Sequence, residues 1–220
     1  MIAEKLSEVK SNLPQGVTLV AVSKTKPNED ILAAYEAGQR IFGENRVQEL
    51  VDKYEALPKD IEWHMIGHLQ TKKVKYIAPF VSLIHGVDSF KLLEEINKRA
   101  KKEERTIDVL LQFHIAQEQS KYGFDFDEAK TMLESQEFTQ LENINVRGVM
   151  GMATFTENEE KIQDEFRTLN NYFEIFRSHF FKFNKSFEII SMGMSGDYKI
   201  AIEEGSNMVR IGSTIFGSRN

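Results

Sequence analysis

Val17-Thr-Leu-Val-Ala-Val-Ser-Lys-Thr-Lys-Pro27 is the segment that distinguishes between two possible α/β folds with parallel strands. The segment opens with a strand-sized apolar run and ends with a proline, which suits the first turn of a helix. An open doubly wound sheet that binds a dinucleotide carries Gly-x-Gly-x-x-Gly at such a turn. This turn lacks that fingerprint and reads Ser23-Lys-Thr-Lys26 instead. The segment therefore favours a closed (β/α)₈ TIM barrel, with the doubly wound sheet as the alternative.

The alternation of a short apolar run with an amphipathic segment recurs along the chain. Strict alternation of strand and helix requires crossover connections, so the strands are parallel, and eight parallel strands can close a barrel. The eight predicted strands are 17–23, 40–43, 63–67, 83–87, 107–114, 146–152, 188–193 and 208–212. Capping residues predict helices at 27–37, 45–57, 88–102, 125–138 and 195–204, and charge periodicity predicts an extra N-terminal helix over residues 1–10. We expect one domain over residues 1–220.

Composition excludes several classes of function. The chain has 28 Lys and Arg against 34 Asp and Glu, a formal charge of −6, so we expect neither nucleic acid nor a membrane as partner. It has no cysteine, which excludes disulfides, thiolate catalysis and cysteine-based metal sites. The charged N-terminus lacks the apolar core of a secretory signal, and no apolar run is long enough to cross a bilayer. We expect a cytoplasmic protein.

The last two strands end in turns suited to an anion. TIM barrels commonly bind phosphate on the loops after strands seven and eight. The amides of Gly193, Gly212 and Ser213 can approach a ligand closely, and Ser195 is expected to open a helix whose dipole attracts negative charge. The hydroxyl groups that add donors belong to Ser191, Ser195, Ser213 and Thr214. The alternative is that these are ordinary strand-to-helix turns, which use the same residue types.

Lys24 ends the first predicted strand. If period-two alternation holds, Thr18, Val20, Val22 and Lys24 share one side, so the amine projects into the barrel mouth. An amine shielded from water loses its proton more readily and becomes able to form an imine with a carbonyl group. The alternatives are a solvated lysine at the rim for Lys24, and for Lys26 either a solvated helix start or a role in cofactor entry.

Arg210 and His64 are two further candidates for the barrel mouth. Arg210 lies two residues before Gly212, where its guanidinium can face a pyridine nitrogen; the alternative is a salt bridge to a carboxylate such as Glu44. His64 and His68 have the i, i+4 spacing of a helical metal pair, but their segment is a predicted strand interrupted by a glycine, so no metal site is expected. His64 is instead expected beside the ligand.

The segment 155–185 carries eight Phe or Tyr residues. Their spacing predicts a long outer helix that packs aromatic side chains onto the barrel.

Together these segments resemble the pyridoxal 5′-phosphate (PLP) homeostasis protein family, small PLP-binding proteins related to the N-terminal barrel of alanine racemase. The motifs are Val20-Ala-Val-Ser-Lys-Thr-Lys-Pro27, Phe42-Gly-Glu-Asn45, Trp63-His-Met-Ile-Gly67, Arg147-Gly-Val-Met150, Ser191-Met-Gly-Met-Ser195 and Val209-Arg-Ile-Gly212. They span nearly the whole chain in the family's order. Ser120-Lys-Tyr-Gly123 also keeps the family's Ser-Lys-x-Gly pattern, whereas of an acidic pair common after Ser195 only Asp197 is present.

The resemblance implies a fold-type III PLP-binding barrel with PLP as the cofactor. It implies that Lys24 carries the cofactor as a Schiff base, that Asn45 and His64 line it, and that Arg210 faces its pyridine nitrogen. The residues implied around the phosphate are Ser191, Met192, Ser195, Gly212, Ser213 and Thr214. No residue is implied to be catalytic, and no metal is implied.

Three functions remain open on the sequence. In the two-domain racemases that this barrel resembles, a second domain supplies a base, and we expect that domain to be missing here, which disfavours two-base racemisation. We therefore expect a monomeric PLP carrier or reservoir in PLP homeostasis, without established catalysis, with PLP-dependent client enzymes as partners. The alternatives are a low-activity PLP-dependent amino-acid racemase or decarboxylase, and a Schiff-base aldolase in which Lys24 reacts with substrate.

Overall fold

The strands of the computed structural model, which describes residues 1–117 and 122–217, form a closed barrel in the order β1 to β8. All neighbouring strands pair in parallel, and β1 closes the barrel against β8. The predicted TIM barrel is confirmed, and the doubly wound alternative is wrong. The strands are β1 Thr18–Val22, β2 Ile41–Glu44, β3 Glu62–Met65, β4 Leu83–Val87, β5 Ile107–Gln112, β6 Ile144–Met150, β7 Ile189–Met194 and β8 Met208–Ile211.

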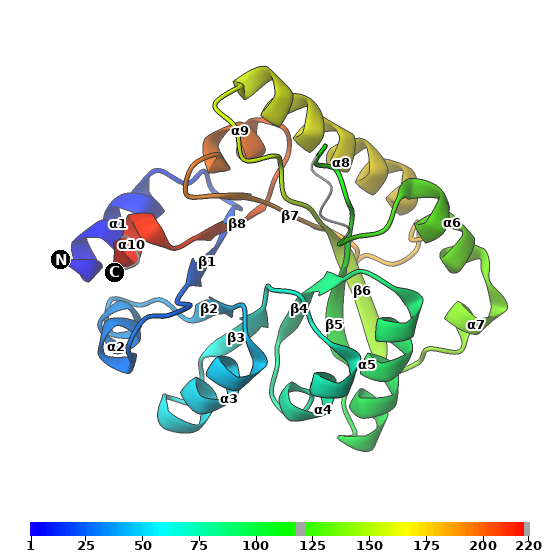
Figure 1. The fold of residues 1–220 in the computed structure, drawn as a ribbon, viewed down its shortest axis with the longest axis horizontal. Coiled ribbons are helices and arrows are strands. Elements are labelled where there is room, and N and C mark those ends of the chain that lie inside the picture. Colours follow the sequence, from blue (N-terminus) through cyan, green and yellow to red (C-terminus); the bar gives the residue numbers. More distant parts are fainter. Residues whose placement is uncertain (118–121, 218–220) are drawn as a thin grey trace.

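Helices surround the barrel, seen end-on in Figure 1. The predicted N-terminal helix is confirmed as α1, which packs against α10, so the first and last helices of the described chain lie side by side (Figure 1). The helices are α1 Ile2–Ser11, α2 Asn28–Glu36, α3 Val47–Ala56, η1 Thr71–Lys73, α4 Val74–Ile77, α5 Phe90–Lys102, α6 Phe126–Glu134, α7 Gln136–Thr139, α8 Glu159–His179, α9 Tyr198–Glu203 and α10 Ser213–Phe216. No helix in the described ranges combines the length and apolarity needed to cross a membrane.

Two apolar layers hold the barrel together. The larger lies between the strands and the surrounding helices, and the smaller fills the barrel interior. The interior layer consists of Val20, Leu83, Leu110, Met150 and Met208, which come from five different strands. Burial of the side chains of both layers stabilises the closed sheet.

The aromatic segment forms the predicted long outer helix, α8. Its residues Phe166, Phe173 and Phe176 are fully or almost fully buried. Phe176 stacks on Phe113, the residue after β5, with ring centroids 5.5 Å apart. Phe183, after the helix, is 93% exposed. The prediction that the segment serves packing is confirmed for the helix itself.

Three predicted helix starts are wrong by one to two residues. Helix α3 follows Arg46, α5 is capped by the Ser89 hydroxyl, and α9 follows Asp197 rather than opening at Ser195. The predicted helix over 125–138 is capped by Asp125 as expected but divides at Ser135, whose extended backbone ends α6 and whose hydroxyl caps α7. A capping side chain accepts from an amide about three residues on, and several nearby polar residues can serve.

Candidate functional site

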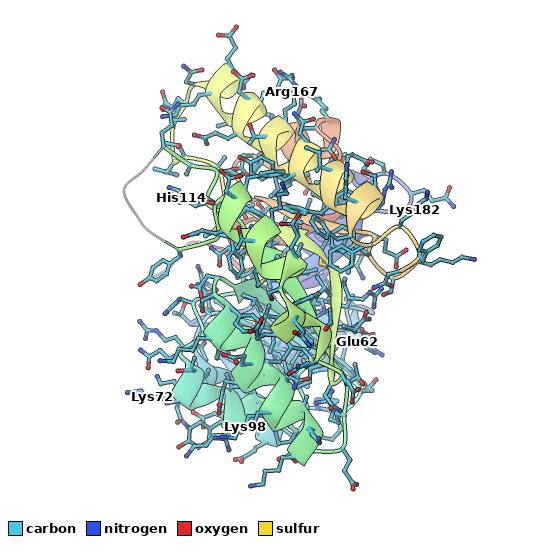
Figure 2. The ribbon with its side chains drawn as sticks, turned by 90° about the vertical axis from the view of Figure 1, so that its right-hand side faces the viewer. Glu62, Lys72, Lys98, His114, Arg167 and Lys182 are labelled. Atoms are coloured by element: carbon cyan, nitrogen blue, oxygen red, sulfur yellow. The ribbon has the colours of Figure 1, made fainter. Side chains whose placement is uncertain are left out.

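The barrel has a cavity at each end. The upper cavity, at the carboxyl ends of the strands, has a volume of about 490 Å³. The lower cavity, at their amino ends, has a volume of about 410 Å³ and includes Glu62 and His64 in its wall. Figure 2 shows the two ends from the side, with His114, which follows β5, opposite Glu62, which begins β3.

Period-two alternation along β1 brings Lys24 to the upper cavity. Thr18 lines the lower cavity, Val20 belongs to the interior layer, and Val22 and Lys24 line the upper cavity. Lys24 lies in the turn just after the strand and is half-buried. The predicted shared side of these four residues is confirmed, because successive side chains of a strand point to opposite faces.

Six of the predicted site residues share the wall of the upper cavity. They are Lys24, Asn45, Ser195, Arg210, Gly212 and Ser213. Lys26 and Asp197 line it as well. The cavity therefore gathers the turns after β1, β2, β7 and β8, although residues 24 and 210 are far apart in the sequence.

The turns after β7 and β8 are bonded to each other. The Gly212 amide donates to the Ser195 hydroxyl oxygen over 3.2 Å. A β-carbon at Gly212 would stand 3.0 Å from the carbonyl oxygen of Val22, so glycine allows the end of β8 to lie close against β1. Since α9 begins only at Tyr198, the predicted helix dipole at Ser195 is wrong; Ser195 serves the turn instead.

Arg210 is a buried cation inside the barrel. Its guanidinium donates to the Ser191 carbonyl oxygen at 2.9 Å and to the Gly151 carbonyl oxygen at 3.1 Å. Burial lowers the pKa of Arg210 to about 10, while the nearby Asp197 carboxylate opposes that shift. Burial raises the pKa of Asp197, whose carboxylate accepts a hydrogen bond from the Met194 amide. Arg210 remains charged at neutral pH.

A chain of hydrogen bonds runs through the barrel interior from Arg210 to the lower cavity. Arg210 donates to the Ser191 hydroxyl at 2.5 Å, that hydroxyl lies 2.9 Å from Nδ1 of His85, and Nε2 of His85 lies 2.9 Å from Nδ1 of His64. Burial lowers the pKa of His64 to about 3, and burial also lowers that of His85. Both imidazoles are therefore neutral.

Four predicted site residues lie away from the upper cavity. His64 lines the lower cavity, because alternation along β3 puts it one layer below Ile66, which lines the upper one. Ser191 is buried beneath Arg210, and Met192 packs in the outer apolar layer. Thr214 is exposed on α10. The structure does not bring these four side chains together with Lys24.

Two groups of residues near the cavity escaped prediction. One is the segment after β6, whose residues Met152 to Thr156 form a wall of the cavity. The other is a buried cluster of Glu44, Glu49 and Lys53 beneath the Lys24 turn. The i, i+4 spacing of Glu49 and Lys53 on a helix was the available signal for it. The predicted alternative of a Glu44–Arg210 salt bridge is wrong, since Glu44 pairs with Lys53.

Two further expectations concern a loop and metals. Ser120 and Lys121 of the Ser-Lys-x-Gly pattern lie outside the described residues, and the Tyr122 ring contacts the His68 ring in a tilted arrangement with ring centroids 4.2 Å apart. Across residues 1–117 and 122–217, no three His, Cys, Asp or Glu side chains are grouped so that they could hold a metal ion.

Comparison with known proteins identifies the family. The alanine racemase N-terminal domain model matches residues 1–220. The pyridoxal phosphate homeostasis protein of Aquifex aeolicus is 42% identical over 203 residues, covering 91% of this chain and 86% of that protein. The protein of that name from Escherichia coli K12 is 34% identical and covers 100% of this chain and 97% of its own length.

Solved structures agree with these relatives. PipY of Synechococcus elongatus PCC7942, with PLP bound, superposes with a TM-score of 0.89 at 34% identity and covers 99% of this chain and 100% of that chain. Alanine racemase of Bartonella henselae shares the fold at a TM-score of 0.72 and 15% identity, covering 99% of this chain and 58% of that one. The chain therefore belongs to the pyridoxal phosphate homeostasis protein family, whose barrel is that of the alanine racemase N-terminal domain.

Proposed function

We propose that this chain binds PLP in the upper cavity as an imine on Lys24 and serves PLP homeostasis as a carrier or reservoir. The observation that carries the proposal is that the Lys24 amine, the Arg210 guanidinium and the Gly212–Ser213 turn share one cavity. Relatives named for PLP homeostasis and the PLP-bound PipY structure support it.

The residues present fit the cofactor. A cavity of about 490 Å³ lies within the usual range for small-molecule sites. The turns of Ser195 and of Gly212–Ser213 offer hydroxyls and glycine backbone to a phosphate, and the buried charge of Arg210 attracts an anionic ligand. Asn45 supplies an amide at the same wall. His64, Ser191, Met192 and Thr214 would support the site indirectly, through the interior chain and the packing of the turns.

PLP supplies an aldehyde that can pass from one amine to another, and a ring that can act as an electron sink. Arg210 determines which of these uses is favoured. A charged guanidinium only donates hydrogen bonds, so opposite a pyridine nitrogen it would leave that nitrogen unprotonated and the ring a weaker electron sink. Lys26 lines the same cavity as Lys24 and offers a second amine during release. Both features favour holding and transferring the cofactor.

The spectrum of the purified protein tests the imine. We expect visible absorption from the imine in the PLP-loaded wild type, none above free PLP in Lys24→Ala, and unchanged absorption in Lys130→Ala, an exposed lysine on α6. An unaltered spectrum in Lys24→Ala would remove the assignment.

A second experiment separates a carrier from a weak enzyme. Loaded protein is mixed with the apo form of a PLP-dependent enzyme, and separately with a panel of amino acids. A carrier restores activity to the apoenzyme and gives no multiple-turnover product from the amino acids. Sustained racemisation or decarboxylation that disappears in Lys24→Ala would overturn the carrier assignment in favour of a PLP-dependent enzyme.

A further inference from the structure

A buried ion cluster lies directly beneath the turn that carries Lys24. The Lys53 ammonium on α3 is almost fully buried and donates to Oε1 of Glu44 at 2.8 Å, to Oε1 of Glu49 at 2.7 Å and to the carbonyl oxygen of Ser23 at 2.8 Å. All three hydrogen atoms of the ammonium thus have an acceptor. Two of these acceptors are carboxylates from β2 and α3, and the third is the backbone just before Lys24.

The same three side chains hold the backbone on both sides of Lys24. The Ser23 hydroxyl donates to Glu44 Oε1 at 2.5 Å, and the Thr25 amide donates to Glu49 Oε1 at 2.5 Å. Lys53 is bonded to both carboxylates and so joins the two contacts. Lys24 therefore projects from a short turn that is fixed at the preceding and at the following residue.

The turn needs such support because its backbone is strained. Thr25 has a φ of 64°, in the left-handed region that β-branched residues rarely adopt. Such a conformation is unfavourable for a β-branched residue and persists only where the surrounding contacts hold it. The hydrogen bond from the Thr25 amide to Glu49 is one such determinant.

The cluster is costly for packing alone. Glu44 is wholly buried, its Oε2 has no hydrogen-bond partner among the described residues, and burial raises its pKa to about 7 despite the neighbouring Lys53. Replacement of buried ion pairs by apolar residues is often neutral or stabilising, so a buried pair is weak evidence for a role in stability. The contacts to Ser23 and Thr25 point to a role in positioning.

We propose that Lys53, together with Glu44 and Glu49, positions the turn of Lys24 so that its amine is presented for imine formation. This inference rests on the proposed function, since it concerns the same amine. Imine formation joins the Lys24 nitrogen to the aldehyde carbon and releases one water molecule. The three residues are positioning residues: Lys53 holds the Ser23 carbonyl oxygen, Glu44 accepts from the Ser23 hydroxyl, and Glu49 accepts from the Thr25 amide.

The test compares two ligands that differ only at the reacting group. PLP carries the aldehyde, whereas 4-deoxypyridoxine 5′-phosphate has a methyl group there and cannot form an imine. Lys53→Met keeps the length of the side chain and removes its three hydrogen bonds. We expect its affinity for PLP to fall by about tenfold or more and its affinity for the deoxy analogue to stay within about twofold of wild type. Equal losses for both ligands would show a merely structural role and overturn the proposal.

Glu49 provides a second pair of variants in case Lys53→Met does not fold, because it lies on α3 and is partly exposed. Glu49→Gln retains an oxygen for the Thr25 amide and should bind PLP nearly as wild type does. Glu49→Leu removes it and should lose affinity for PLP selectively. The exposed Lys130→Met on α6 is the matched control for loss of a lysine charge. Equal PLP affinity of the Gln and Leu variants would contradict the proposal.

A double-mutant cycle keeps this inference separate from the proposed function. If Lys53 acts through Lys24, Lys53→Met has no further effect on PLP affinity in a Lys24→Ala background. If Lys53→Met lowers PLP affinity as much in the Lys24→Ala background as in the wild type, the positioning role is refuted. The assignment of the imine to Lys24 is not affected by that result. Retention of the imine absorption in Lys24→Ala would instead refute the proposed function itself.

Discussion

Glu44 and Arg210 are both buried ionisable groups near the same turn, yet they lie on opposite faces of the sheet. Alternation along β2 puts Ile41 and Asn45 at the two cavities inside the barrel, so Glu44 points outward to Lys53 on α3. Arg210 points inward. The sequence shows both charges but not which face each occupies, because the parity of a strand is known only once one of its side chains has been placed.

The titration of Glu44 gives a prediction at this scale. Burial raises its pKa from 4.5 to about 7, so between these pH values the native state keeps a proton that the unfolded chain has released. The unfolded state then binds fewer protons, and stability falls as pH rises through this window. Relative to Glu44→Gln, the wild type should lose about 3 kcal/mol of unfolding free energy between pH 4.5 and 7.

Urea denaturation of both proteins across this pH range measures the difference between their unfolding free energies. The titration of all other groups contributes equally to both proteins and cancels in this difference. If the stability of the wild type relative to Glu44→Gln does not change with pH, or rises with pH, the pKa of the buried Glu44 carboxyl is not raised as described.

Among the secondary-structure elements, strands were predicted better than helix starts. Most strands are buried on both faces, so the sequence displays them as short apolar runs. Helix starts depend on which of several polar residues caps the helix. Ser195 and Asp88, which were expected to cap helices, have other partners: the Ser195 hydroxyl oxygen accepts from the Gly212 amide, and the Asp88 carboxylate contacts His68 over 3.2 Å. These partners are distant in sequence, so local capping rules cannot foresee them.

The same limit applies to the candidate site. Lys24, Arg210 and the Gly212–Ser213 turn were predicted because each ends a strand whose direction is known in a barrel. His64 was expected beside the ligand but lines the other cavity, because a shift of two residues along a strand moves a side chain by one layer. For His64, the sequence left open which layer of the barrel interior its side chain occupies.

Helix α8 offers a matched pair of aromatic truncations. Phe176 is fully buried among Phe113, Phe126 and Phe180, whereas Phe183 is 93% exposed just after the helix. We expect Phe176→Ala to lower the unfolding free energy by about 3–5 kcal/mol and Phe183→Ala to change it by less than about 0.5 kcal/mol. Chemical denaturation measures both, and comparable effects in the two variants would mean that α8 does not pack as described.

The end of β3 gives a prediction about the cavity wall. A β-carbon at Gly67 would clash with the backbone oxygen of Asn45, so Gly67→Ala must displace the turn that brings Asn45 to the upper cavity. We expect lower thermal stability and a PLP affinity reduced by about tenfold or more. Isothermal titration of the folded variant checks this, and an unchanged dissociation constant would argue against Asn45 as part of the binding wall.

At the scale of the whole molecule, the barrel interior is a stack of layers between two cavities. The apolar interior layer and the chain from Arg210 to His64 fill the space between them. The Arg210 guanidinium is held in this chain by hydrogen bonds to Ser191 and Gly151. We therefore expect its charge to be in place before a ligand arrives, which lowers the cost of binding.

The distribution of exposed apolar side chains bears on association. Among the described residues, Tyr76, Ile175 and Phe183 are exposed on separate elements, and only Met152, Phe155 and Met194 gather at the upper cavity. Stable dimers bury large contiguous patches. We therefore expect a monomer of 25.4 kDa in sedimentation equilibrium at micromolar concentration. A concentration-independent dimer would contradict this expectation.

The proposed binding mode requires one covalent link between the turn after β1 and the ligand of the upper cavity. Borohydride reduction of the PLP-loaded protein, followed by peptide mass mapping, locates that link directly. We expect one phosphopyridoxyl group, on Lys24, and loss of the adduct in Lys24→Ala. A principal adduct on any other lysine, or no adduct on a protein that retains PLP, would contradict it.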